Sequence, residues 1–131
     1  MQPTRIHHVG LPVSDLERSI AWYCDALGLT HEFTAQVPEG VAIAFLVAPA
    51  GEKLELFAVD ATDAAWEGPI PALRAGVAHT GWTVDDLDAV HARAVEAGGR
   101  SVWAPRDSPE PGRRMAFVAD PDGNLVELIS A

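Results

Sequence analysis

Apolar residues at helix and strand spacing divide the first half of the chain into five elements. Ser-Asp-Leu-Glu at residues 14–17 forms a capping box that opens a helix, and Gly28 ends it. Runs rich in apolar and β-branched residues lie on either side, separated by turns that contain Pro and Gly. We therefore predict a β-α-β-β-β module, with strands at residues 5–13, 30–37, 41–48 and 53–59.

The same order of patterns recurs in the second half. A strand-like run is followed by a helix with one apolar side and then by further strands, at residues 77–84, 85–98, 100–104 and 115–128. The last stretch reverses at Asp-Pro-Asp-Gly-Asn, whose Pro and Gly favour a tight turn. We predict a single domain over residues 1–131, with modules at about 4–60 and 77–131 joined by a linker at 61–76.

Direct comparison of the halves indicates an internal repeat. The segments that begin at His8 and His79 match at Gly, Val, Asp and Leu positions, a shift of 79 − 8 = 71 residues. With one inserted residue, Lys-Leu-Glu-Leu-Phe around Glu55 aligns with Leu-Val-Glu-Leu-Ile around Glu127. The alternative is chance similarity of two amphipathic segments, but His and Glu recur in register with their surroundings. Each module therefore has one His and one Glu at equivalent places.

Glu127 is unusual for its surroundings, because both faces of its strand are otherwise apolar. A buried carboxylate without a partner costs roughly several kcal/mol, so Glu127 needs a base, a metal ion or an exposed strand face. Two imidazoles and two carboxylates suit Zn²⁺, Ni²⁺, Co²⁺, Mn²⁺ or Fe²⁺, and the lack of thiolates argues against a closed structural zinc site. An octahedral ion with four protein ligands keeps two positions for substrate oxygens, where it would acidify an adjacent C–H group.

Composition narrows the classes of partner. The 131 residues carry a formal net charge of −10, which repels nucleic acid and anionic lipid surfaces. No stretch approaches the about 20 apolar residues of a membrane span, and the N-terminus has no apolar signal core. We expect a cytoplasmic protein that binds neither nucleic acid nor membranes. Cys24 lies at helical spacing with apolar residues and is expected to pack in the core rather than act as a nucleophile.

A segment rich in Pro and Arg, residues 105–114, is predicted to be a loop that borders a pocket, rather than a plain surface connection. Its arginines, Arg106, Arg113 and Arg114, are candidates to bind an anionic ligand, and Trp103 is a candidate pocket wall.

Strand alternation separates two neighbouring histidines. His7 and His8 are predicted to lie on one strand and therefore to point to opposite faces. His7 is accordingly expected to pack against a helix or to lie on the surface, outside the metal site.

The paired modules, the His in each first strand and the Asp-Pro-Asp-Gly-Asn-Leu-Val-Glu-Leu-Ile ending resemble the vicinal oxygen chelate superfamily. This superfamily includes glyoxalase I, extradiol dioxygenases, methylmalonyl-CoA epimerase and the fosfomycin and bleomycin resistance proteins. The resemblance covers nearly the whole chain and implies an α+β fold that curls a mixed sheet around a metal cleft. The glyoxalase I order of metal ligands falls on His8, Glu55, His79 and Glu127. It implies one divalent ion as cofactor, with Glu127 and Glu55 as the catalytic carboxylates.

Other positions depart from individual branches of the superfamily. Bacterial glyoxalase I uses an Arg and an Asn to hold glutathione, and those positions here are Pro12 and Val59. Extradiol dioxygenases have a catalytic Tyr where this chain has Phe117, which we count among the substrate-binding candidates. These differences argue against glutathione as part of the substrate and against dioxygenase chemistry.

The resemblance implies a glyoxalase I-like isomerase or lyase that acts on a small vicinal-oxygen substrate through an enediolate. The alternative is a protein that sequesters a drug without catalysis, like the bleomycin resistance proteins. A homodimer is expected in either case. Its metal sites would lie within one chain or be shared between two, and the glyoxalase I pattern favours shared sites.

Overall fold

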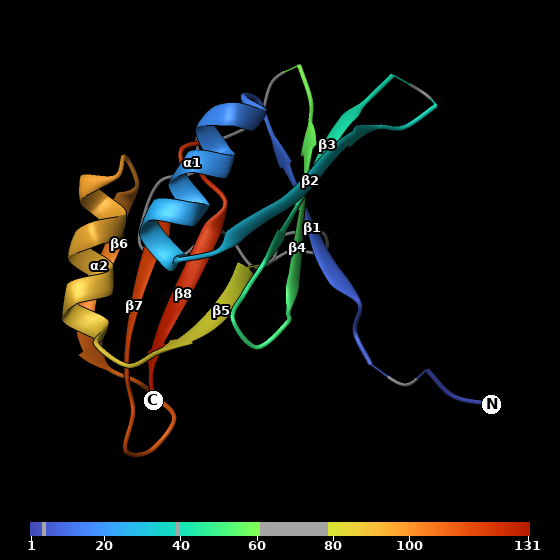
Figure 1. The fold of residues 1–131 in the computed structure, drawn as a ribbon. Helices are drawn as coiled ribbons and strands as arrows, with labels where there is room; N and C mark the ends of the chain where they lie inside the picture. The colour runs from blue at the N-terminus through green and yellow to red at the C-terminus, as the bar shows by residue number, and fades with distance from the viewer. Residues whose placement is uncertain (4, 39, 61–78) are drawn as a thin grey trace.

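The chain folds into two β-α-β-β-β modules, as predicted (Figure 1). The computed structural model describes residues 1–3, 5–38, 40–60 and 79–131, so the predicted linker at 61–76 lies outside the described residues. The elements of the first module are β1 (His8–Val13), α1 (Leu16–Leu27), β2 (Thr30–Gln36), β3 (Ala42–Val47) and β4 (Lys53–Ala58). Those of the second are β5 (His79–Val84), α2 (Leu87–Glu96), β6 (Arg100–Asp107), β7 (Arg114–Ala119) and β8 (Leu125–Ser130).

Each module forms a four-stranded mixed sheet with the same topology. The strand orders are β1-β4-β3-β2 and β5-β8-β7-β6, in which the first pair is parallel and the other pairs are antiparallel. Neither sheet closes into a barrel within the described ranges, and β1 and β5 are both edge strands. No helix in the described part of the chain is long and apolar enough to span a membrane.

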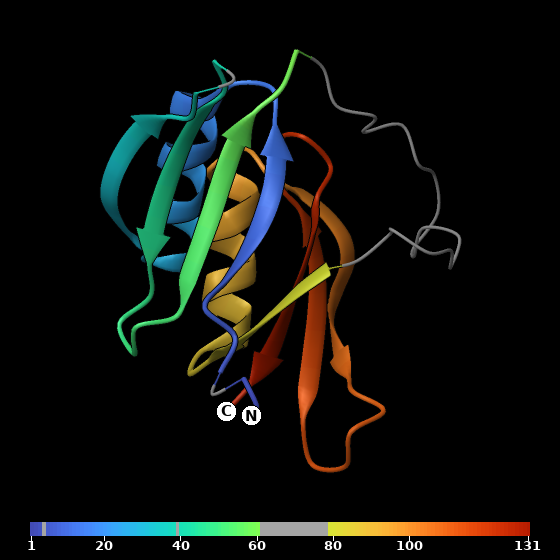
Figure 2. The ribbon, with the colours of Figure 1, turned by 90° about the vertical axis from the view of Figure 1, so that its right-hand side faces the viewer.

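The two helices lie side by side and share one core between the sheets (Figures 1 and 2). The Trp22 indole N–H donates to the Ala94 carbonyl at 3.0 Å, and the Arg93 guanidinium donates to the Ala26 carbonyl. One face of each sheet packs against this helical layer, through residues such as Leu54 and Leu56 in β4 and Val126 and Leu128 in β8. The other face of each sheet is therefore turned away from the helices.

This packing determines the buried side of the first helix. Trp22 and Tyr23 are almost completely buried, because α2 and the β7–β8 turn cover them. Cys24 is only partly buried at the edge of the core, and burial raises the pKa of its thiol, so a thiolate nucleophile is disfavoured. The helix is capped by Asp15 rather than Ser14, through an Asp15 carboxylate that accepts from the Arg18 N–H at 3.0 Å.

Two predicted strand boundaries also differ from those in the structure. The first strand begins at His8 and not at residue 5. The strand β6 continues to Asp107, into the predicted 105–114 loop, because residues 106 and 107 pair with Met115 and Arg114. The connection between β6 and β7 is correspondingly shorter than the sequence indicated.

The turn between β7 and β8 docks the second module onto the first. The Asp120 carboxylate accepts from the Tyr23 hydroxyl at 2.7 Å and from the backbone N–H groups of Asp122 and Asn124. The Asp122 carboxylate accepts from the backbone N–H and the hydroxyl of Ser14, at 3.0 and 2.6 Å. Both aspartates are almost fully buried, so these bonds form a polar contact inside the interface between modules.

Replacing Tyr23 with Phe is expected to lower the free energy of unfolding by about 2 kcal/mol at neutral pH, because the lost hydrogen bond ends on a carboxylate. Burial raises the pKa of Asp120 above 3.8, although hydrogen bonds from Asn124 and Tyr23 oppose this rise. The folded state therefore holds this proton more tightly than the unfolded chain, and ionisation of Asp120 lowers stability as the pH rises from 3.8 through the raised pKa.

The Tyr23 hydroxyl favours the charged carboxylate, so its contribution is complete above the raised pKa of Asp120 and shrinks as the pH falls through it. Urea unfolding of both proteins at neutral pH and near pH 3.8 measures this difference. An equal loss at both pH values would show that the bond to the carboxylate is not the source of the effect.

Candidate metal centre

The second module brings His79 and Glu127 together on the sheet face opposite its helix. Because β5 and β8 are parallel, with Gly81 in register with Glu127, His79 two residues earlier lies on the same face. The His79 Nε2 atom is 2.9 Å from the Glu127 Oε2 atom. The His79 side chain is 46% exposed and that of Glu127 is 19% exposed, so a ligand can reach both from outside.

The first module repeats this arrangement. Gly10 in β1 is in register with Glu55 in the parallel strand β4, which places His8 on the Glu55 face. The His8 Nε2 atom lies 4.0 Å from the Glu55 Oε1 atom. The sequence repeat thus corresponds to two half-sites, defined here as His8 with Glu55 and His79 with Glu127.

The donor atoms and the space around them fit a divalent ion. Two ligand atoms bound about 2.1 Å from one ion at a right angle lie about 3 Å apart, close to the 2.9 Å between His79 and Glu127. The space beside each carboxylate is open because Gly10 and Gly81 have no side chain. A Cβ at these glycines would lie 3.5 Å from Glu55 Oε1 and 3.9 Å from Glu127 Oε2.

The two half-sites of one chain do not converge. In the part of the chain that the structure describes, no three His, Cys, Asp or Glu side chains are grouped closely enough to hold one ion. The helices pack between the two sheets (Figure 2). Strand register places both half-sites on the sheet faces turned away from the helices.

Three of the predicted substrate-binding residues lie on the same face as His79 and Glu127. Phe117 is opposite Glu127 across β7 and β8, and its ring centroid lies 5.3 Å from that of His79. The Trp103 ring meets Phe117 edge-on at 5.5 Å, and the Arg106 guanidinium lies 4.4 Å above the Trp103 ring. These side chains form a continuous wall that leads outward from the second half-site.

The other two predicted arginines point elsewhere. Arg114 forms an ion pair with Asp88 of α2 at 3.1 Å, on the helix side of the sheet. Arg113 pairs with Glu110 at 3.0 Å and donates to the Ser130 carbonyl at 2.7 Å. Both guanidinium groups are thus engaged in contacts within the chain, away from the second half-site.

Sequence reasoning missed a matching aromatic wall beside the first half-site. The Phe45 ring lies 5.4 Å from His8, and Phe33 stacks on Phe45 at 5.1 Å. The repeat carries the signal that would have found it, because the shift that aligns the two glutamates (127 − 55 = 72) also aligns Phe117 with Phe45 (117 − 72 = 45).

His7 does not face away from His8, contrary to the prediction from strand alternation. The Nδ1 atoms of the two rings are 2.9 Å apart, within hydrogen-bond distance. Alternation does not apply because β1 begins at His8, which leaves His7 outside the strand. His7 thus contacts one ring nitrogen of His8, while the other nitrogen is the one nearer Glu55.

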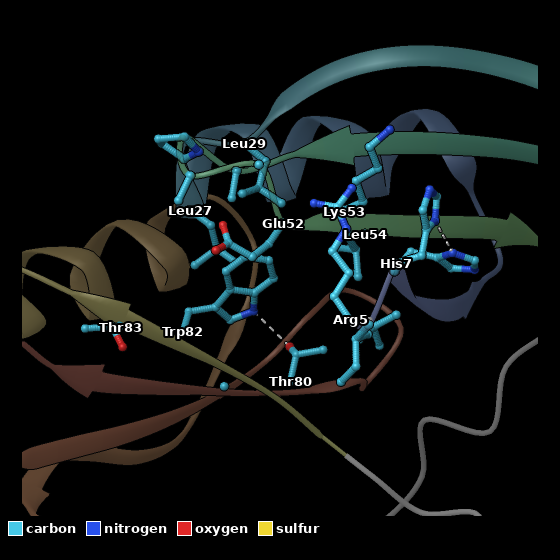
Figure 3. Close-up of a pocket in the computed structure, with 18 of the residues that line it drawn as sticks. Arg5, His7, Leu27, Leu29, Glu52, Lys53, Leu54, Thr80, Trp82 and Thr83 are labelled. Carbon is cyan, nitrogen blue, oxygen red and sulfur yellow. Dashed lines mark hydrogen bonds between the residues drawn. The ribbon is translucent and has the colours of Figure 1, made fainter. Parts of the chain in front are cut away.

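A groove of about 1000 Å³ opens between β1, the turn before β4, and β5 (Figure 3). His8 and His79 both line it, along with Trp82, whose indole N–H donates to the Thr80 hydroxyl at 2.9 Å. The groove therefore runs along the two edge strands that carry the histidines.

The two paired β-α-β-β-β modules, each with a four-stranded mixed sheet, have the vicinal oxygen chelate fold. Residues 5–128 match the family described as Glyoxalase/Bleomycin resistance protein/Dioxygenase superfamily, and the chain belongs to this superfamily. The resemblance inferred from the sequence motifs is thereby confirmed.

Two named relatives and one solved structure illustrate the match. The chain is 34% identical over 132 residues to lactoylglutathione lyase of Haemophilus influenzae, covering 95% of this chain and 91% of the relative. It is 30% identical over 123 residues to a probable lactoylglutathione lyase of Synechocystis sp., covering 93% and 92%. Glyoxalase I from Zea mays superposes with a TM-score of 0.77 at 27% identity, over 95% of this chain and 44% of that chain. These similarities support a function within the glyoxalase superfamily.

Proposed function

We propose that this protein is a divalent-metal-dependent lyase or isomerase of the glyoxalase I type. The observation that carries the proposal is the pair of half-sites, each with an imidazole nitrogen and a carboxylate oxygen on an open sheet face. A His₂Glu₂ donor set suits Zn²⁺, Ni²⁺, Co²⁺, Mn²⁺ or Fe²⁺. A protein that only sequesters a drug has no need for two such pairs in equivalent places.

We further propose that the protein is a homodimer in which each metal site combines the first half-site of one chain with the second half-site of another. Three observations support this arrangement. The half-sites of one chain do not converge among the described residues, β1 and β5 are edge strands that can pair with another copy, and Phe33 leaves an aromatic ring exposed beside the first half-site. A second copy would supply the missing ligands and cover these surfaces.

The chemistry follows from the positions of the two carboxylates. A divalent ion bound at such a site polarises a substrate carbonyl and acidifies the adjacent C–H group. Glu127 would accept the proton that this carbon loses and return it to the neighbouring carbon, and Glu55 is the equivalent group of the first module. The rings of Phe45 and Phe117 would exclude water from the reacting carbons. Because Pro12 and Val59 replace the two glutathione-holding residues, we propose a substrate without glutathione.

Elemental analysis of the protein purified without added metal tests the proposal, and we expect about one divalent ion per chain. Chelation should then lower the melting temperature, because an ion present at 100 times its Kd stabilises the folded state by about 2.7 kcal/mol. Re-addition of the same metal should restore the melting temperature. A protein without metal, with a melting temperature indifferent to chelator and to added metal, would instead support the drug-binding function.

A further inference from the structure

The strand β6 places Arg106 on the same open sheet face as the second half-site. Arg106 is opposite Met115 in the β6–β7 register, and directly opposed residues share a face. Met115 packs with Phe117 and Leu125 on that face, away from the helices. Arg106 therefore lies at the outer end of the wall that begins at His79.

The contact of Arg106 with Trp103 leaves its N–H donors available. The guanidinium carbon lies 4.4 Å from the centroid of the Trp103 ring, over the ring, which is a cation–π contact. Such a contact does not use the N–H donors of the guanidinium, and these can bind two oxygens of an oxyanion side by side.

Ion pairing distinguishes Arg106 from other cations of the chain. Arg113, Arg114 and Lys53 each pair with a carboxylate, at 3.0, 3.1 and 3.3 Å. Among residues 1–3, 5–38, 40–60 and 79–131, no carboxylate lies within ion-pair distance of Arg106. The charge of Arg106 is therefore available to a ligand.

The charge of the proposed metal site makes such a cation important. The carboxylates of Glu55 and Glu127 would balance the two charges of a divalent ion, so the bound ion would have little net attraction for an anion. The chain as a whole carries a formal charge of −10, which repels anions at longer range. An anionic substrate would need a cation within its own length of the metal site, and Arg106 lies at the far end of the wall that starts at His79.

We propose that the substrate of this protein carries an oxyanion, a carboxylate or a phosphate, in addition to its two adjacent oxygens, and that Arg106 binds it. The adjacent oxygens would lie at the metal site, and the body of the substrate would lie along Phe117 and Trp103. This inference rests on the proposed function and assigns it a substrate class: small anionic compounds rather than neutral ones.

The test uses Co²⁺-loaded protein and alkyl hydroxamates, which are chelators with two adjacent oxygens. Three series of increasing chain length end in a methyl, a carboxylate or a phosphonate group, and the Co²⁺ absorption spectrum reports binding of each. We expect wild-type protein to bind one anionic series about 10- to 100-fold more tightly than the methyl series, as for a ligand that gains charge-assisted hydrogen bonds. The preferred anionic series identifies carboxylate or phosphate as the natural group.

The variant Arg106→Gln should lose this preference but bind the methyl series with unchanged affinity. The matched control Arg113→Gln removes a nearby guanidinium that is paired with Glu110, and it should keep the preference. If the Co²⁺-loaded wild type bound all three series with equal affinity, the anionic substrate class would be wrong while the metal site would stand. If the preference survived Arg106→Gln, the role of Arg106 would be wrong. Failure to bind Co²⁺ at all would overturn the metal site and this inference with it.

Discussion

Refolding the His8→Ala and Glu127→Ala variants together is expected to restore metal binding that neither variant has alone. Each variant damages one half-site and leaves the half-site of the other module intact. If sites are shared between chains, one of the two sites in every mixed dimer combines the intact first module of the Glu127→Ala chain with the intact second module of the His8→Ala chain. Metal content and chelator-sensitive melting of the isolated mixed dimer measure the recovery.

A second mixture provides the control. His8→Ala and Glu55→Ala both damage the first module, so every shared site of their mixed dimer lacks one ligand and no recovery is expected. Sites enclosed within single chains predict no recovery from either mixture. Recovery from both mixtures, or from neither when mixed dimers have formed, would contradict the shared arrangement.

Replacing His79 with Ala or Glu127 with Gln is expected to abolish tight binding of the divalent ion. Each change removes one donor of a pair whose atoms lie 2.9 Å apart, and with it one of the four ligands of the proposed metal ion. The loss of metal affinity should be larger than the roughly 10- to 100-fold loss that follows when only a residue that orients a ligand is removed. Isothermal titration of the metal-free variants with Zn²⁺ or Ni²⁺ measures the affinity.

His7→Ala is the matched control for this loss. His7 contacts the Nδ1 atom of His8 and can orient that ring. Its removal should therefore reduce metal affinity by no more than roughly 10- to 100-fold, the loss typical for a residue that only orients a ligand. If His7→Ala were as damaging as His79→Ala, His7 itself would be a ligand and the His8–Glu55 half-site would have to be redefined.

The two modules and the four candidate ligands follow from patterns in the amino-acid sequence. Strand alternation and helix spacing depend on residues close together in the chain, so the pattern around Glu127 and its repeat around Glu55 identified both strands. The His residues recur at a shift of 71 residues, one less than the shift of 72 between the glutamates. The structure places each His beside its Glu because the first and last strands of each module are parallel neighbours.

The relative placement of the two modules depends on packing between distant segments. Two amphipathic helices can cover their own sheets in several relative placements, and local periodicity does not distinguish between them. Contacts between distant residues, such as Trp22 with Ala94 and Tyr23 with Asp120, hold the modules in a placement in which the described residues of one chain do not group three candidate ligands together. The roles of the loop arginines were decided in the same way.

The predicted loop contains three arginines, Arg106, Arg113 and Arg114, and nothing in the sequence favours one of them as the ligand-binding residue. The register of β6 against β7 places Arg106 on the open face, while ion pairs hold Arg113 and Arg114 elsewhere. His7 shows the same limit, because its contact with His8 depends on where β1 begins. Charge and residue type can be read directly from the sequence. Strand register and packing between distant segments determine on which face a side chain lies and which residue it contacts.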